Sequence, residues 1–128
     1  MNHIPKIIIK TIDPGAQRVA ECGDWFFDAE DYTVTIFVSR MEDWRSELAV
    51  AIHECLESIA CLAADIDQTD IDFHDKLYYK EHSDDDAQAG DDPKAPYFTQ
   101  HVAATFVERE VCSQLKIGWT QHEQNCDA

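Results

Sequence analysis

The chain is short of basic residues. Its 128 residues include 10 lysines and arginines against 26 aspartates and glutamates, which gives a formal net charge of −16. A protein that binds nucleic acid through the phosphates needs a positively charged surface. The composition therefore argues against direct nucleic-acid binding. It fits a soluble cytoplasmic protein, a protein that binds cations, or an acidic surface that imitates nucleic acid.

Long apolar stretches are also missing. No stretch approaches the roughly 18 consecutive apolar residues of a transmembrane helix. The opening segment, MNHIPKIIIKTID, has too short an apolar run for a signal peptide, and no small-residue cleavage site follows it. We therefore expect a cytoplasmic location and no membrane partner.

The cysteines show no C-x-x-C spacing. They are odd in number and scattered along the chain: Cys22, Cys55, Cys61, Cys112 and Cys126. Three of them lie in predicted helices among aliphatic residues, where a free cysteine acts as a small hydrophobic residue. This usage predicts a reducing compartment and no structural disulfide.

The sequence does contain enough apolar residues, 45% of the chain, to fold as one domain spanning residues 1–128. Alternating or β-branched runs predict short strands at about 4–12, 23–27 and 32–38. Helical periodicity predicts two main helices, from about Trp44 to Ala64 and from about Tyr97 to Leu115. We expect an α+β fold in which a small antiparallel sheet packs on these helices, with a mobile acidic loop at about 80–95 and a frayed tail at about 121–128.

The first predicted helix carries unusual polar residues in the stretch AIHECLESIAC, residues 51–61. Its expected apolar face consists of Leu48, Ile52, Cys55, Leu56, Ile59, Leu62 and Ala63. His53 and Glu57 are four residues apart, so they lie one helical turn from each other, along the border of that face. This position allows both side chains to open into a cleft while the helix stays anchored in the core.

The H-E-x-x-E pattern of this helix favours a metal site. Two ligands at positions i and i+4 are the arrangement by which H-E-x-x-H enzymes bind zinc, and zinc also accepts a carboxylate oxygen. Glu54 follows the first ligand directly, where such sites place the carboxylate that takes a proton from water. The pattern therefore predicts His53 and Glu57 as ligands of Zn²⁺, or of another divalent metal, and Glu54 as a catalytic base.

The second predicted helix supplies the third ligand that this chemistry needs. His101 lies on one stripe of that helix together with Glu108, among residues expected to be buried. We predict His101 as a ligand. Glu108 could accept the second N–H of that ring or bind the metal itself, but from two turns away on the same helix we expect it to reach another group near the metal. Tyr97, at the start of the helix, is a candidate donor to an oxyanion, or it simply packs with its hydroxyl in water.

A simpler interpretation stays open at this point. A five-residue match is a weak signal, and the polar side of an ordinary helix can read H-E-x-x-E by chance. The other histidines fit a surface position better than a site: His3, His74, His82 and His122. The acidic runs at 84–86 and 91–92 lack the spacing of a calcium-binding loop and are expected to be solvated.

Three blocks of the sequence resemble a family of small, uncharacterised bacteriophage and prophage proteins: CGDWFFD, TVTIFVSRMEDWRSELAVAIHECLESIAC and GDDPKAPYFTQHVAATFVERE. The family has W-x-x-E-x-x-x-A-x-H-E-x-x-E, then G-D-D-P-x-A-P-Y-x-x-x-H-x-x-A-x-x-x-E after an acidic middle. Every one of these positions is matched here, and the resemblance extends from about Gly23 to Trp119. The family is similar in turn to a minimal zincin, the fold of many zinc peptidases.

The resemblance implies a phage-encoded, zinc-binding, metallopeptidase-like protein that hydrolyses a peptide or amide bond in the host cytoplasm. It implies His53, Glu57 and His101 as ligands and Glu54 as the base. The alternative is a non-catalytic acidic protein that occupies a basic host protein, as an inhibitor or nucleic-acid mimic, with a structural metal or a polar cluster. A virion or assembly component is a third reading, although the sequence has no heptads or repeats typical of a fibre.

Overall fold

The computed structural model describes residues 3–82 and 87–127. Part of the predicted acidic loop, residues 83–86, lies outside these ranges. The elements follow one another in this order: β1 (Lys6–Ile12), the short 3-10 helix η1 (Pro14–Ala16), β2 (Gly23–Asp28), β3 (Thr33–Ser39), α1 (Trp44–Ala63), α2 (Gln68–Glu81), the 3-10 helix η2 (Ala89–Asp91), α3 (Phe98–Gln114) and α4 (Trp119–Asp127). The α+β class is thus confirmed.

The three strands form one mixed sheet in the order β1-β3-β2. β2 and β3 pair antiparallel through a hairpin, in which the Asp28 carboxylate accepts hydrogen bonds from the backbone N–H groups of Glu30 and Asp31. β1 pairs parallel to β3, with Ile9 opposite Ile36. The prediction of a wholly antiparallel sheet was therefore wrong for β1, because alternation within a strand does not encode the direction of its partner.

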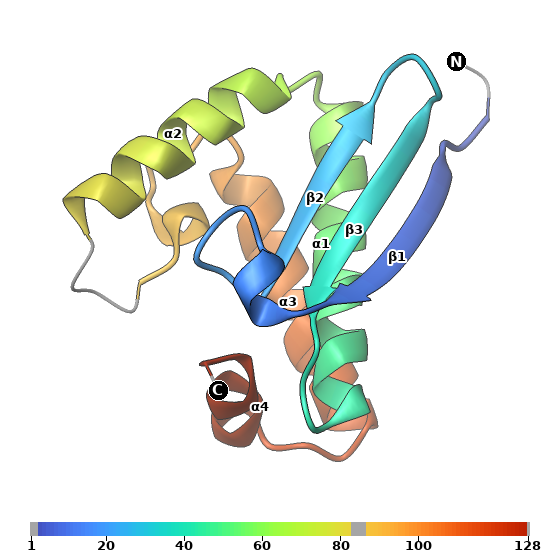
Figure 1. Cartoon of the computed structure of the whole chain (residues 1–128), viewed down its shortest axis with the longest axis vertical. Coiled ribbons are helices and arrows are strands. Elements are labelled where there is room, and N and C mark those ends of the chain that lie inside the picture. The colour runs from blue at the N-terminus through green and yellow to red at the C-terminus, as the bar shows by residue number, and fades with distance from the viewer. Residues whose placement is uncertain (1–2, 83–86, 128) are drawn as a thin grey trace.

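Helix α1 lies behind the sheet, and α3 packs beside α1 (Figure 1). Asp43 caps α1, since its side chain accepts a hydrogen bond from the backbone N–H of Arg45. The main core joins the inward residues of the sheet to α1 and to the segment before α3; its buried members are Trp25, Val34, Ile36, Val38, Val50, Ala51, Cys61, Ile71, Ala95 and Tyr97.

The buried side of α1 differs from the predicted one. The residues that it buries are largely small or polar: Ser46, Ala49, Val50, Ala51, His53, Glu54, Glu57, Ser58 and Cys61. Leu48, which was expected in the core, is 39% exposed, and Ile52 is only partly buried. Because α3 and the sheet both pack against the polar side, the two carboxylates and the imidazole lie inside the protein.

Helix α2 follows α1 and is tied to the sheet by side chains. The Gln68 amide donates to the carbonyl of Trp25 at 2.7 Å and accepts from the backbone N–H of Phe27 at 2.9 Å. Arg18 bridges Asp24 of β2 and Asp72 of α2 at 2.6 and 3.0 Å. Much of the acidic middle of the chain is thus a docked helix, which the sequence analysis did not include among its main helices.

The segment predicted to be a frayed tail forms α4 (Figure 1). The buried residue of this helix is His122, at 1% exposure, although the sequence suggested a surface histidine. At the start of α4 the guanidinium of Arg109 lies 4.4 Å from the ring centre of Trp119. Helix α4 was not predicted because it is short and polar, and its sequence has no apolar periodicity that would indicate a buried side.

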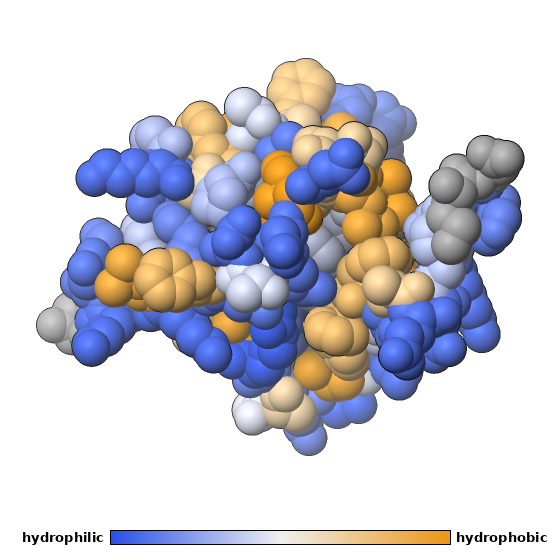
Figure 2. Space-filling model, turned by 90° about the horizontal axis from the view of Figure 1, so that it is seen from above, coloured by the Kyte–Doolittle hydropathy of each residue, from blue (hydrophilic) through white to orange (hydrophobic). Residues whose placement is uncertain are grey.

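The surface is not uniformly polar despite the net charge. Seen from above, hydrophilic residues surround a band of hydrophobic ones (Figure 2). Exposed large hydrophobic residues occur at or before β1, on β2 and on three helices: Ile4, Ile7, Ile9, Phe26, Trp44, Leu48, Phe73, Leu77, Val102 and Phe106. Within residues 3–82 and 87–127, no helix has the length and apolar character needed to cross a membrane.

Candidate metal centre

Three side chains predicted as ligands meet between α1 and α3. Glu57 Oε2 lies 3.1 Å from His53 Nε2 and 2.9 Å from His101 Nδ1. The ligand atoms of the three residues all lie within 4.8 Å of one another, and this is the cluster of the described residues that could hold a metal ion. All three residues are at most 6% exposed.

The outward nitrogen of each imidazole faces another carboxylate. His53 Nδ1 lies 2.7 Å from Glu108 Oε1, although this oxygen is off the line of the ring N–H. His101 Nε2 lies 3.1 Å from Asp91 Oδ1, which belongs to η2. A metal-binding histidine almost always donates its other N–H to such a carboxylate or carbonyl, which fixes the tautomer and the ring orientation.

The count of protons shows why the cluster favours a cation. A neutral imidazole donates from one nitrogen only. If His53 and His101 donate outward to Glu108 and Asp91, their inward nitrogens present lone pairs to a carboxylate oxygen of Glu57. The lone pair of each imidazole, 3.1 and 2.9 Å from Glu57 Oε2, repels the lone pairs of that oxygen unless a proton or a metal ion lies between them.

The spacing also suits zinc. Zinc–ligand bonds of about 2.0–2.2 Å in a tetrahedral site place neighbouring ligand atoms about 3.3–3.5 Å apart. The two contacts of Glu57 Oε2, 3.1 and 2.9 Å, are shorter than this by only a few tenths of an ångström. The two imidazole nitrogens lie within 4.8 Å of each other. Side-chain shifts could therefore bring the three ligand atoms onto one ion and leave a fourth coordination position open.

Hydrogen bonds determine the charge of the cluster. Burial alone would raise the pKa of Glu57, but the hydrogen bonds from His101 and His53 lower it to about 2, so the carboxylate is ionised. Burial lowers the pKa of His53, whereas its contacts with Glu108 and Glu57 raise it well above the usual value. The site thus holds buried negative charge and stabilises a positive charge beside it.

Trp25 of β2 fixes the other oxygen of Glu57. The indole Nε1–H donates to Glu57 Oε1 at 3.1 Å, and the ring is 4% exposed. Oε2 is therefore the oxygen left to face both imidazoles. Trp25 was not predicted as part of the site. It lies in the predicted short strand CGDWFFD, but nothing in that stretch indicates a contact with Glu57.

Two glycines let the backbone approach the site closely. A Cβ atom at Gly90 would lie 2.5 Å from Cγ and Nδ1 of His101, and a Cβ atom at Gly23 would lie 2.7 Å from Glu54 Oε1. Both distances are well inside van der Waals contact. Gly90 is thus required for the packing of η2 on the ring of a candidate ligand.

Glu54 faces a cavity of about 550 Å³ that is also lined by Glu57 and His101. The side chain is 8% exposed, and within the described ranges no residue donates a hydrogen bond to its carboxyl group. Burial, then the charge of Glu57, raises its pKa well above the usual value. A carboxyl group with a raised pKa beside a metal site suits proton transfer near neutral pH.

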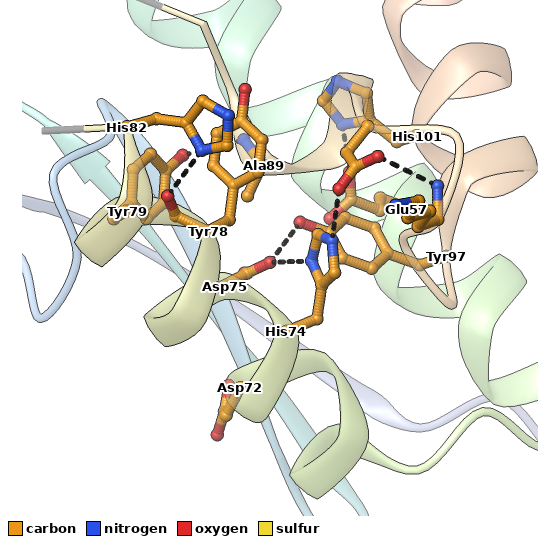
Figure 3. Close-up of polar contacts among 12 residues, drawn as sticks. Glu57, Asp72, His74, Asp75, Tyr78, Tyr79, His82, Ala89, Tyr97 and His101 are labelled. Carbon is orange, nitrogen blue, oxygen red and sulfur yellow. Dashed lines mark hydrogen bonds and ion pairs between the residues drawn. The ribbon is translucent and has the colours of Figure 1, made fainter. Parts of the chain in front are cut away.

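Tyr97 lies near the cluster but is directed elsewhere. Its hydroxyl donates to Asp75 Oδ1 at 2.7 Å, and His74 approaches the same oxygen at 3.2 Å (Figure 3). His74 also contacts Asp92 at 3.1 Å, so it belongs to a polar network rather than to a solvated face. With its single proton given to Asp75, Tyr97 does not offer a donor to an oxyanion in this geometry.

The main residue that the sequence analysis missed is His122, which contacts Glu108 from α4. No spacing in the sequence links these two residues, because α4 reaches the site only through tertiary packing. The chain matches no protein-family model, no curated protein and no solved structure. The resemblance to phage proteins and to zincins therefore stays a prediction.

Proposed function

We propose that this protein is a phage-encoded, zinc-binding, metallopeptidase-like hydrolase that acts on a peptide or amide bond in the host cytoplasm. The convergence of His53 Nε2, Glu57 Oε2 and His101 Nδ1 carries the proposal. Two imidazoles and one carboxylate suit zinc, and three protein ligands with one open position are typical of catalytic rather than structural sites. The phage assignment rests on the sequence resemblance alone.

A bound zinc ion would supply Lewis acidity toward a water molecule and toward the substrate carbonyl. Glu54 is the residue of the chain that would take a proton from water and return it to the leaving amine. Its carboxyl group faces the cavity without a competing hydrogen bond in the part of the chain that the structure describes. Its pKa would fall beside a cation, which leaves it able to accept a proton at neutral pH.

The strand that could hold a peptide is β2. The central strand β3 pairs with a strand on both sides and has no free edge for a peptide. β2 has an outer edge beside the cavity, where the Gln68 amide bonds to the backbone of Trp25 and Phe27. An amide group already fits this edge, which supports a peptide or another amide as the substrate class.

The first test is metal analysis of the untagged protein. We expect about one zinc ion per chain after purification, and its loss in His53→Ala. Exposed His3 provides the control, since His3→Ala should keep the metal. Glu54→Gln should also keep the metal while abolishing cleavage of a peptide library. Zinc-free wild-type protein in zinc-supplemented buffer would contradict the proposal.

The net charge of −16 favours a second candidate function, binding to a basic host protein. Such binding would depend on long-range charge pairing, which salt screens over about 10 Å at 0.1 M. A host complex that forms in low salt and dissociates at moderate salt, both for the wild type and for His53→Ala, would support this function independently of the metal.

A further inference from the structure

A chain of hydrogen bonds runs from the C-terminal helix to Glu108, which in turn lies against His53 of the candidate metal centre. His122 Nε2 lies 2.5 Å from Glu108 Oε2, while the other oxygen of Glu108 faces His53. His122 Nδ1 lies 2.9 Å from Ser46 Oγ, which also contacts Asn125 Nδ2 at 3.0 Å. Ser46, His122 and Glu108 are all at least nine-tenths buried.

The donor of each hydrogen bond in this series can be assigned by starting from Gln121, at the end farthest from the candidate metal centre. Gln121 donates to Asn125 Oδ1 at 2.8 Å, so the NH₂ group of Asn125 faces Ser46. Because Ser46 Oγ accepts from Asn125, its own proton is free to go to His122 Nδ1. A neutral His122 then carries its proton on Nε2, where it donates to Glu108.

Glu108 connects His122 to the candidate ligand His53. One oxygen of Glu108 accepts from His122 Nε2, so the carboxylate is held with its other oxygen toward α1. The second oxygen lies 2.7 Å from His53 Nδ1, close enough for a small rotation of either side chain to let it accept the Nδ1 proton. This leaves the lone pair of His53 Nε2 pointing at Glu57 and His101, as a metal ligand requires.

We propose that His122 is a positioning residue of the metal centre: its Nε2–H holds Glu108, and Glu108 in turn sets the tautomer and orientation of the ligand His53. The inference rests on the proposed metal function. It gives α4 a specific role, because the helix supplies both His122 and Asn125 from the last nine described residues.

The test compares two substitutions of one residue. His122→Leu fills the space but removes the donor, whereas the His122→Gln amide can still donate to Glu108. Zinc dissociation constants would be measured by competition with a chromophoric chelator, well below the unfolding temperature of each metal-free variant. We expect His122→Leu to bind zinc about 10–100-fold more weakly and His122→Gln to stay within a few-fold of the wild type.

Asn125→Asp provides a test that does not disturb His122. The new carboxylate can only accept, so it takes the Ser46 proton. At a pH high enough to keep the ring neutral, at which the affinities are measured, His122 must then donate from Nδ1 and turn a lone pair to Glu108. We expect weaker zinc binding even though the variant adds a negative charge. The cobalt-substituted protein should show an altered absorption spectrum if the ring of His53 shifts.

Three results separate the possible outcomes. Wild-type affinity in His122→Leu, or an equal loss in His122→Gln and His122→Leu, would overturn the positioning role. Unchanged or tighter binding in Asn125→Asp would overturn it as well. A wild-type protein that binds no zinc at all would instead overturn the proposed function, on which this role depends.

Discussion

At the residue scale, the site depends on the lack of a side chain at residue 90 as well as on the ligands. Gly90 has no side chain, and this lets η2 pack its backbone against the ring of His101 while Asp91 contacts the Nε2 of that ring. The close approach leaves Nδ1 facing Glu57 at 2.9 Å. A single methyl group at residue 90 therefore competes directly with the ligand geometry.

Gly90→Ala should weaken zinc binding by about 10-fold or more, because its Cβ would lie 2.5 Å from His101 Nδ1 and force the ring or η2 to move. Chelator competition would measure the change. Gly15→Ala is the matched control, since a Cβ atom there has no neighbour within 4 Å. Equal zinc affinity in both variants would show that the close packing of η2 on the ring of His101 is not needed for metal binding.

At the element scale, α1 explains both what the sequence predicted and what it concealed. The spacing of His53 and Glu57 predicted their common side of the helix, and the stripe of His101 and Glu108 was likewise correct. The apolar residues of α1 suggested the neighbouring face as the core, and Cys55, Ile59 and Leu62 of that face do pack against the core. That prediction failed for Leu48 because α3 and the sheet bury the polar side instead, which only tertiary packing determines.

The contact between α2 and the sheet can be tested through Gln68. Its two hydrogen bonds to the β2 backbone satisfy groups that no strand pairs. Gln68→Ala should lower the free energy of unfolding by about 1–3 kcal/mol, since both bonds are partly buried. Urea unfolding would show the difference, with exposed Thr69→Ala on the same helix as the control. A loss no larger than that of the control would mean that water replaces the amide without cost.

At the scale of the whole molecule, the site joins parts of the chain that the sequence keeps far apart. Glu57 and His101 are 44 residues apart, and His122 lies 76 residues from Ser46. Local patterns predicted helices and a partial set of ligands, but they carried no signal for Trp25, Asp91 or α4. Those residues reach the site through the order of the sheet and the packing of helices, which no spacing in the sequence encodes.

The large negative charge also affects stability as a function of pH. Burial, and then the charges of Asp75 and Glu57, raises the pKa of Glu21 in the folded protein from 4.5 to about 8. The folded state thus holds this proton more tightly than the unfolded chain, so the contribution to stability is full below pH 4.5 and is lost as the pH rises through about 8.

The metal-free protein should therefore lose more stability between pH 5 and pH 9 than Glu21→Gln, which stays neutral throughout. Thermal unfolding across this range would give the comparison. Glu30→Gln removes the same charge at an exposed site and should follow the wild type. If the unfolding temperatures of the wild type and Glu21→Gln change in parallel with pH, Glu21 is ionised without penalty in the folded state.

The central claim is that His53, Glu57 and His101 bind one metal ion. A crystal grown with zinc and measured at the zinc absorption edge tests it most directly. The account predicts an anomalous peak within about 2.0–2.2 Å of His53 Nε2, Glu57 Oε2 and His101 Nδ1. A fully loaded crystal with no peak between these atoms, or with either imidazole turned away from Glu57, would contradict it.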